Sequence, residues 1–261
     1  MSDAPAGLAV QTQKRYGWRP DHPDMRDYLL AVEPAKTLPR TVSLRSKMPA
    51  VYDQGQLGSC TANSIGAILE FNELKQAESD ATTPSRLFIY YNERAMEGTI
   101  TQDSGAEIRD GIKSVAQLGA PPETDWPYVI TKFARKPPAR AYKDALKHQA
   151  IQYARVAQTD MGIQNVLAAG YPISFGFTVY ESFETDVGSD GIVPMPQPGE
   201  STLGGHAVVA TGYKQIRRQL YFECRNSWGP DWGDHGYFWL PAIYVTSRNL
   251  AQDFWVIEQV E

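Results

Sequence analysis

Cys60 stands where a reactive thiol could be activated. A polar, glycine-rich turn, DQGQLGS over residues 53–59, leads directly into a helical pattern whose first residue is Cys60. The free N–H groups and the positive dipole end at a helix N-terminus lower the pKa of a thiol. The side-chain amide of Gln54, on the same turn, could face the oxyanion that forms when a thiolate attacks a carbonyl. A small buried hydrophobe is the alternative for Cys60, and this turn alone leaves both interpretations open.

A catalytic thiol needs a base, and His206 is the best-placed of the four histidines. It follows Gly204 and Gly205 and opens an apolar strand pattern, AVVATGY over 207–213, as expected for a side chain in a cleft wall. A satisfied core histidine is the alternative for His206. The other three lie in a proline-rich N-terminal segment, on a charged face and in a turn, and they are His22, His148 and His235.

Asn226 could orient such a base. The segment NSWG, residues 226–229, directly follows a strand pattern that ends at Cys224. An asparagine carbonyl can accept a hydrogen bond from one imidazole nitrogen and so assign the other nitrogen to the thiol. Trp228 could cover that hydrogen bond and exclude water, although a turn asparagine beside a core tryptophan would give the same pattern.

The elements that must position these side chains change in character along the chain. A helix is predicted from Cys60, because Ala62, Ile65, Ile68 and Leu69 share one face, which Leu74 extends. Helices are also predicted over 85–97, 106–118 and 159–169, with a turn-rich connector over 119–140 and a loop over 188–205. Strands are predicted over 173–179, 206–213, 219–224 and 237–240.

This order predicts an α+β fold with three segments. Residues 1–40, with five prolines, form an N-terminal arm expected to pack on the body. Residues 41–145 form a mainly helical domain that carries Cys60, and residues 146–261 form a mainly β domain that carries His206 and Asn226, although the termini could cross between them. Two such parts leave a cleft between them.

Composition excludes several classes of function. The 261 residues carry a formal net charge of −5, and no dense Lys/Arg cluster suggests nucleic acid. Two cysteines without a C-x-x-C pair exclude a disulfide scaffold and argue against a zinc ribbon or a thioredoxin-type site. No apolar run could span a bilayer, and the start lacks the basic and apolar regions of a signal peptide. The default expectation is therefore the cytoplasm, with secretion by another route left open.

The motifs together resemble the papain-like cysteine peptidases, in particular a bacterial branch. QGQLGSC over 54–60 resembles the family pattern Q-G-x-C-G-S-C, and GHAV over 205–208 resembles its histidine strand. NSWGPDWG over 226–233 resembles N-S-W-G-x-x-W-G, continued by Gly236 and Tyr237, and WPY over 126–128 resembles Y-P-Y. These motifs occur in the family's order across residues 41–261, which makes the resemblance specific.

The resemblance implies a function and a set of roles. The fold would be a helical left domain and an antiparallel, barrel-like right domain with the active site in the groove between them. The chain would be a cysteine endopeptidase that forms an acyl-enzyme from peptide or protein substrates and needs no metal or organic cofactor. The implied catalytic residues are Cys60 as nucleophile, His206 as base and acid, Asn226 as its orienter and Gln54 in the oxyanion hole. The implied substrate-binding residues are Ser104 and Gly105, which pair with substrate backbone; Gly176, Gly205 and Ala207, which line a roomy pocket for a bulky apolar side chain; and Trp232 on the leaving-group side, with Trp228 as structural support.

The chain departs from the family pattern at three points. Leu57 replaces the first cysteine of the motif, so the disulfide that this cysteine makes in the family is excluded and packing must stabilise the helical domain. Thr61 replaces the aromatic residue that usually follows the nucleophile. The long helical pro-region of the family has no counterpart in the 40 residues before the mature-like segment.

Two further questions stay open at the level of sequence. An inactive binding module and an acyl transferase on the same scaffold are alternatives, of which intact Cys60, His206, Asn226 and Gln54 disfavour the first. The arm carries Tyr16, Trp18 and Tyr28, which prefer burial, so it could cross the cleft as an intramolecular inhibitor. It could equally be a strap along the back of the domains. Lys36 and Arg40 are candidate processing positions.

Overall fold

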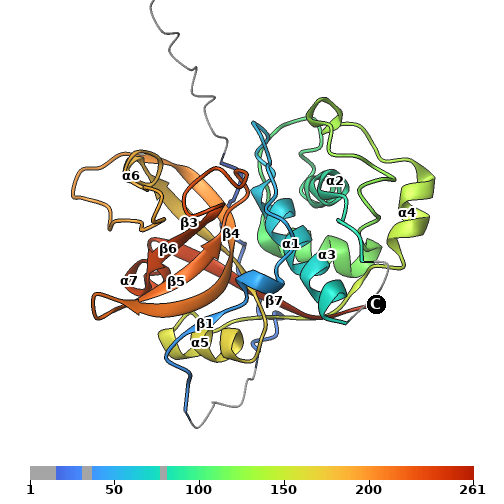
Figure 1. Ribbon diagram of the computed structural model, residues 1–261. Helices are drawn as coiled ribbons and strands as arrows, with labels where there is room; N and C mark the ends of the chain where they lie inside the picture. The colour runs from blue at the N-terminus through green and yellow to red at the C-terminus, as the bar shows by residue number, and fades with distance from the viewer. Residues whose placement is uncertain (1–15, 31–36, 77–80) are drawn as a thin grey trace, which may run out of the picture.

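The computed structural model describes residues 16–30, 37–76 and 81–261 of the chain. Its helical half follows a short strand and a 3-10 turn, and it lies at the right in Figure 1. The helices of this half are α1 (Cys60–Lys75), α2 (Arg86–Met96), α3 (Ile108–Leu118) and α4 (Ala139–Ala145), with 3-10 turns η1 (Arg45–Lys47) and η2 (Ile130–Lys132). The helices predicted over 85–97 and 106–118 are α2 and α3.

The other half is an antiparallel sheet in the order β2-β7-β3-β4-β5-β6, with β1 paired to β4. Its strands are β1 (Val42–Ser43), β2 (Ala150–Arg155), β3 (Ile173–Tyr180), β4 (Thr202–Ile216), β5 (Gln219–Arg225), β6 (Tyr237–Pro241) and β7 (Ala251–Val260). The accompanying helices are α5 (Asp160–Ala168), α6 (Glu181–Thr185) and α7 (Ala242–Thr246). The α+β prediction is confirmed, but among the described residues β2 and β6 remain unpaired edges, so the sheet is open and not a closed barrel.

Helix α1 lies at the junction of the two halves and is buried along most of its length. Apolar or small side chains lie on nearly all sides of this helix, because it packs on α2 and α3 on one side and on β4 and β7 on the other. Leu74, expected on the buried face, is 46% exposed because the helix runs out past the core at its last turn. A helix buried on all sides holds its first residue, Cys60, firmly against the sheet.

The register of the sheet brings the predicted groove residues together. In the β3–β4 ladder Phe177 pairs with His206 and Gly176 with Ala207. In the β4–β5 ladder Val209 pairs with Arg225, which places the residue after Arg225 beside the His206 end of β4. Because side chains alternate across a strand, this register puts Gly176, Gly205 and Ala207 on one face of the sheet, the face on which Ser174 hydrogen bonds to Ser64 of α1.

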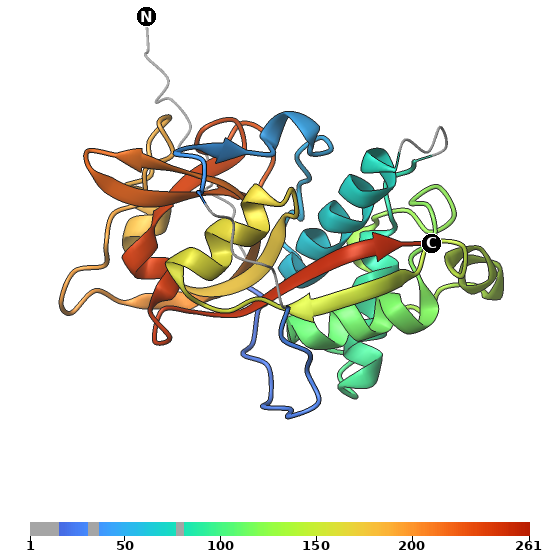
Figure 2. The ribbon, with the colours of Figure 1, turned by 90° about the horizontal axis from the view of Figure 1, so that it is seen from below.

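The arm residues 16–30 run along the junction between the two halves. The backbone of Trp18 forms a parallel bridge with Ala106, and Leu29 forms one with Arg155. Figure 2 shows the stretch between these bridges as a dark blue loop that projects from the junction. Trp18 is buried, but Tyr28, also expected to be buried, is 82% exposed because it lies on the outer side of this loop.

Two expectations from the sequence concern the processing positions of the arm and the absence of membrane-spanning segments. Lys36, a candidate processing position, lies outside the described residues, whereas Arg40 is described and exposed. Within the residues that the structure describes, no helix combines the length and the apolar character needed to cross a membrane.

Candidate active site

Cys60 begins α1 and is fully buried beneath the arm. Burial is the largest influence on the thiol and raises its pKa to about 12. Backbone hydrogen bonds from Ala207, Gly17 and Thr61 act in the opposite direction and lower the pKa, but burial outweighs them. The thiol is therefore neutral in this state, although it lies among donors that would stabilise a thiolate once water reached it.

His206 and Asn226 form the hydrogen bond expected of a base and its orienter. The Nε2 atom of His206 lies 2.8 Å from Asn226 Oδ1, and both residues are buried. The Trp228 ring packs on the imidazole with ring centroids 4.9 Å apart and planes inclined by 30°. Trp228 thus covers the hydrogen bond and keeps water from it, as the sequence predicted.

A short antiparallel backbone ladder joins the nucleophile turn to the asparagine turn. Gln54 N–H donates to the Ser227 carbonyl at 2.9 Å, and Gly229 N–H donates to the Tyr52 carbonyl at 3.0 Å. The Ser227 hydroxyl also donates to Gln54 Oε1 at 2.6 Å. This fixes which end of the Gln54 amide is the oxygen, so the Nε2 group is directed toward the turn, where it donates to the Leu57 carbonyl at 2.8 Å.

The WPY motif stabilises the same turn. The Tyr128 hydroxyl lies 2.5 Å from Ser59 Oγ and donates to the Gln54 carbonyl at 3.0 Å. It therefore ties both ends of the turn that precedes Cys60 to the helical half.

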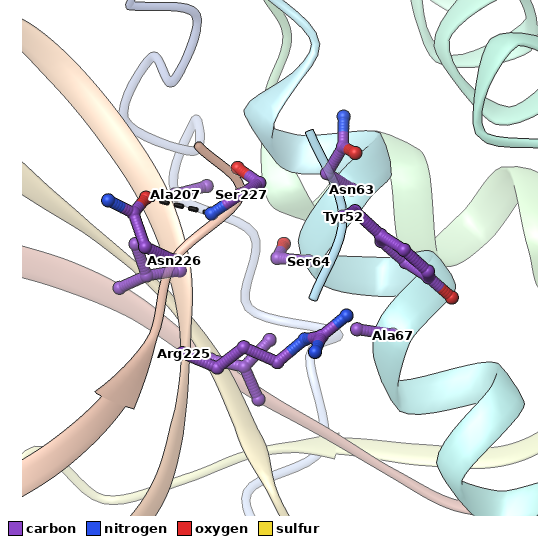
Figure 3. Close-up of a pocket in the computed structure, with 10 residues that line it drawn as sticks. Tyr52, Asn63, Ser64, Ala67, Ala207, Arg225, Asn226 and Ser227 are labelled. Carbon is purple, nitrogen blue, oxygen red and sulfur yellow. Dashed lines mark hydrogen bonds between the residues drawn. The ribbon is translucent and has the colours of Figure 1, made fainter. Parts of the chain in front are cut away.

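Behind the site a small cavity separates α1 from β4 and β5. Figure 3 shows Asn63, Ser64 and Ala67 of α1 facing Asn226 and the residues beside it across this cavity. The Asn226 carboxamide turns back on its own loop and accepts a hydrogen bond from Ser227 N–H at 2.8 Å. Asn226 Oδ1 therefore has two donors, the Ser227 amide and the His206 ring, which hold it in one orientation.

Gly176 and Gly205 line a pocket that Trp18 of the arm fills. A Cβ atom built on Gly176 would lie 2.0 Å from Cε2 of the indole, and one on Gly205 would lie 2.3 Å from the Trp18 carbonyl oxygen. Only glycine therefore leaves room for a large side chain here. The indole Nε1–H donates to Asp253 Oδ2 at 3.1 Å at the far end of the pocket.

The opposite wall of the groove pairs with the arm backbone. Ala106 N–H donates to the Gly17 carbonyl at 2.7 Å, and Arg19 N–H donates to the Ala106 carbonyl at 3.0 Å. A Cβ atom built on Gly105 would lie 2.0 Å from the Gly17 carbonyl oxygen. Ser104, one residue earlier, is held by hydrogen bonds from its hydroxyl to Thr99 Oγ1 and to the Gly105 carbonyl. The arm thus pairs with Ala106, the residue that follows the predicted Ser104 and Gly105.

Comparison with known proteins agrees with this geometry. A family model described as papain family cysteine protease matches residues 38–252. The chain belongs to this family. It is 41% identical, over 95% of its length and 88% of the relative's, to an uncharacterised peptidase C1-like protein of Acanthamoeba polyphaga mimivirus. It also resembles the crystal structure of xylellain, a cysteine protease from Xylella fastidiosa, with a TM-score of 0.87, 40% identity, and coverage of 98% of this chain and 100% of that one. Procathepsin L 3 from Tenebrio molitor larval midgut, at 18% identity and a TM-score of 0.67 over 91% and 74% of the two chains, shares the fold.

The predictions of a papain-like family, of an α+β fold with two parts and of a cysteine peptidase are therefore confirmed. The departures from the family pattern have local structural solutions. Leu57, at the position of the missing cysteine, is 2% exposed in the core of the helical half. Thr61 donates a 2.6 Å hydrogen bond to the buried Glu93 carboxyl, Oε1, where the family usually has an aromatic side chain.

The remaining cysteine and histidines lie elsewhere in this papain-like fold. Cys224 is fully buried in β5, within the hydrophobic core of the sheet half. His148 Nδ1 lies 2.9 Å from Glu73 Oε1, His22 pairs with Glu107, and His235 lies in a turn with φ of 52°. His148, expected on a solvated face, is only 20% exposed because Glu73 holds it against α1.

Sequence reasoning missed Asp253, which closes the Trp18 pocket of this papain-like groove. Asp253 lies in β7, a strand that the sequence analysis did not predict, and it has φ of 61°. Its side chain accepts hydrogen bonds from both the Trp18 indole and the Asp21 amide of the arm. The pocket predicted for an apolar side chain therefore has a carboxylate at its end.

A cluster of three carboxylates adjoins the arm. One oxygen each of Glu97, Glu107 and Asp110 lie within 4.8 Å of one another. Arg19 of the arm forms an ion pair with Glu97, and the His22 ring contacts Glu107, so both acids already have partners on the arm.

Proposed function

We propose that the chain is a cysteine endopeptidase held in a latent, zymogen-like state by residues 16–19 of its own arm. Cys60 is the nucleophile, His206 the general base and acid, and Asn226 the residue that orients the imidazole. Support comes from the buried His206–Asn226 hydrogen bond and from the position of Cys60 at the start of α1, hydrogen bonded to the amide that follows His206.

The reaction follows from these groups. Because Nε2 of His206 faces Asn226, we assign Nδ1 to proton exchange with the thiol. The Cys60 thiolate attacks the scissile carbonyl, and the oxyanion is held by the Gln54 side-chain amide and the Cys60 N–H. The C–N bond then breaks as His206 gives its proton to the leaving amine, and water, deprotonated by His206, hydrolyses the thioester to restore the thiol.

The family resemblance gives the substrate a direction. It assigns Gly176, Gly205 and Ala207 to the pocket for the second residue before the cut, and it assigns Trp232, whose ring centroid lies 5.1 Å from that of Trp228, to the leaving-group side. A substrate therefore runs from the Gly176 pocket, past Cys60, toward Trp232.

The arm runs through the same groove in the opposite direction. Tyr16 lies on the leaving-group side, with its ring centroid 6.0 Å from that of Trp228, whereas Trp18 lies in the Gly176 pocket. The intervening Gly17 hydrogen bonds to the Cys60 thiol through its backbone. A reversed peptide does not present its carbonyl to the oxyanion hole as a substrate does, so the arm blocks the groove and resists cleavage.

A substitution confined to the arm tests this proposal. A Cβ atom at position 17 would lie 1.8 Å from the Gly58 carbonyl oxygen, so Gly17→Val cannot seat in the groove. We expect the full-length Gly17→Val protein to hydrolyse a short neutral peptide amide at least about tenfold faster than the parent, because the three backbone hydrogen bonds of residues 17–19 to the body and the burial of Trp18 are lost. Labelling of Cys60 by a small alkylating agent should accelerate in parallel.

The control is Met25→Ala, at a fully exposed position in the same arm. It should match the parent in both assays. Equal rates for the parent and Gly17→Val, with both proteins folded by circular dichroism, would show that the arm does not limit access to Cys60.

A further inference from the structure

Three basic side chains of the body are each paired with an aspartate of the arm beyond the Trp18 pocket. Arg109 and Lys113 project from α3, and Arg155 ends β2; we call these three residues the basic cluster. Asp27 pairs with Arg109 at 2.6 Å, Asp24 with Lys113 at 3.7 Å and Asp21 with Arg155 at 2.7 Å.

The two arginines of the cluster converge on a single carboxylate oxygen. Asp27 Oδ2 accepts from Arg109 Nη2 at 2.6 Å and from Arg155 Nε at 2.7 Å. The side chains are largely withdrawn from water, with 5% exposure for Arg109, 8% for Asp27 and 24% for Arg155. Charged hydrogen bonds at such sites are stronger than exposed ion pairs.

Asp21 occupies a second carboxylate site beside the first. Its Oδ1 accepts from Arg109 N–H at 3.0 Å, and its Oδ2 accepts from Arg155 Nη2 and, at 2.8 Å, from the indole N–H of Trp255. All of these donors belong to the body, and the Asp21 side chain is 0% exposed. The body therefore presents a built set of donors for acidic side chains, drawn from helix α3 and strands β2 and β7.

Arm release would leave this set of donors without its carboxylates. The three aspartates leave with the arm, and the acid of the body that still pairs with Arg155 is Asp253, at 3.4 Å. The three basic side chains of the cluster then face two carboxylates of the body, Asp253 beside Arg155 and Asp110 beside Arg109 and Lys113, and keep an excess of one positive charge. That excess favours a new anionic partner, above all one that arrives on an extended peptide.

We propose that the open enzyme uses Arg109 and Arg155 to bind an acidic side chain of its peptide substrates, upstream of the cut. The proposal rests on the proposed function, because the arm must leave first. Asp21 is three residues from Trp18, and an extended chain covers about 10 Å in three residues. A substrate with one side chain in the Trp18 pocket therefore places an acidic residue about three positions farther toward its N-terminus.

The neighbouring acids make this preference specific to position. Glu97 and Glu107 face the basic arm residues Arg19 and His22. An acidic side chain that entered next to the Trp18 pocket would meet these carboxylates and be repelled. An acidic substrate side chain is therefore favoured only at the basic cluster. We expect a preferred substrate to place its charges where the docked arm places its own.

The test compares matched peptides on one enzyme sample. The enzyme is full-length Gly17→Val, and each substrate carries a single Asp or a single Asn at one of the third to sixth positions before the cut. Because the same enzyme sample hydrolyses both peptides, the fraction of enzyme molecules with an open groove does not affect the ratio of kcat/KM for the Asp and Asn peptides. We expect a maximum ratio of about tenfold near the fifth position, because the Asp side chain adds a negative charge that faces the two guanidinium groups, and a lower ratio in high salt.

Substitutions then locate the preference. Arg109→Gln and Arg155→Gln, each in the Gly17→Val background, should bring the ratio close to one. Arg140→Gln is the matched control, because it removes one positive charge from a side chain that is 80% exposed on α4, and it should keep the ratio. Circular dichroism and thermal melting establish that each variant is folded.

Two results would overturn the proposal: a ratio near one at every position in the Gly17→Val enzyme, or a ratio that survives both arginine substitutions. Failure of the latency proposal is seen separately, as a Gly17→Val enzyme no faster than the parent on the neutral peptide. The Asp-to-Asn ratio can still be measured on that enzyme, so the two proposals fail independently.

Discussion

The two thiols of this chain are equally buried but have different neighbours. Cys224 lies in the core of the sheet half, where burial and Glu223 raise its pKa well above the ordinary value. Cys60 is also raised by burial, but three backbone amides hydrogen bond to its sulfur and the arm covers it. Removal of the arm can hydrate Cys60, whereas Cys224 stays in the core, so only Cys60 has a route to a reactive thiolate.

Substitution of the two cysteines should therefore separate chemistry from packing. In the Gly17→Val background, Cys60→Ala should lower kcat by about four orders of magnitude or more, as expected when a nucleophile is removed. Cys224→Ala should keep most of the activity and lose some stability, because it leaves a small cavity. Peptide hydrolysis and thermal melting measure the two effects. Labelling of Cys224 by an active-site alkylator would contradict the assignment.

At this site, the residues that the sequence predicted are those that belong to short motifs. These motifs contain Cys60, His206, Asn226 and Gln54, and the structure places His206 in hydrogen-bond contact with Asn226. Asp253 stands in no such pattern. Its place at the end of the Trp18 pocket results from an unusual backbone conformation in β7 and from the docking of the arm, which only the folded chain reveals.

Among the helices and strands, periodicity predicted those whose apolar pattern is complete within one segment of the chain. The apolar face of α1 and the alternation of β3 are local signals, and both elements lie where expected. Strands β2 and β7 were not predicted, because their mixed polar sequences are stabilised by pairing with each other, with register shifts, across about 100 residues of chain. The first residues of β4 were expected in a loop for the same reason, since their partner is the end of β3.

Packing around Leu57 replaces a disulfide in the turn before Cys60. Leu57 is 2% exposed and belongs to the core of the helical half, and both cysteines of the chain are free. Leu57→Ala should lower the free energy of unfolding by about 2–5 kcal/mol, the range for a buried leucine. Leu146→Ala, at a site 50% exposed, is the matched control and should change it little. Denaturant unfolding measures both variants.

Reductant provides the complementary check on the same turn. It should leave the melting temperature of the parent unchanged while protecting the activity of Cys60 from oxidation. A fall in melting temperature under reductant would indicate a disulfide and would contradict the role given to Leu57.

Docking of the arm should weaken as pH rises. Burial is the largest cause that raises the pKa of Asp21, and repulsion from Asp253 adds to it. Together they raise the pKa of Asp21 to about 7 while the arm is docked, whereas a released arm leaves Asp21 in water at its ordinary pKa. A group whose pKa is higher while the arm is docked stabilises the docked state. This stabilisation is complete at pH values below the ordinary pKa of the group. That contribution is lost as the pH rises through about 7.

The activity of the parent relative to Gly17→Val should therefore increase between pH 5 and pH 8. This ratio cancels the pH dependence of the chemistry that the two proteins share. Asp21→Asn should flatten the rise, because it removes the titrating group of the arm. If the ratio falls over the same pH range, acid releases the arm from the groove, and the predicted direction of the pH dependence is wrong.

At the scale of the whole molecule, the arm does two things at once. Asp27 joins Arg109 of the helical half to Arg155 of the sheet half, while Gly17 and Trp18, ten and nine residues earlier, lie in the groove between those halves. The arm therefore lies across the cleft, as the inhibitor hypothesis requires, and also joins the two halves, as the strap hypothesis requires.

Loss of the Asp27 carboxylate should accordingly affect stability and activity together. Asp27→Asn leaves the buried guanidinium of Arg109 and the partly buried one of Arg155 facing a neutral amide, and breaking a buried ion pair costs at most about 3–5 kcal/mol. We expect the melting temperature to fall and hydrolysis of a short neutral peptide to rise, because the same contact holds the halves together and the arm in the groove. Asp190→Asn, an exposed carboxylate on the loop before β4, should change neither. A lower melting temperature without faster hydrolysis would leave the arm as a strap alone, because activity per folded molecule would then not depend on its attachment.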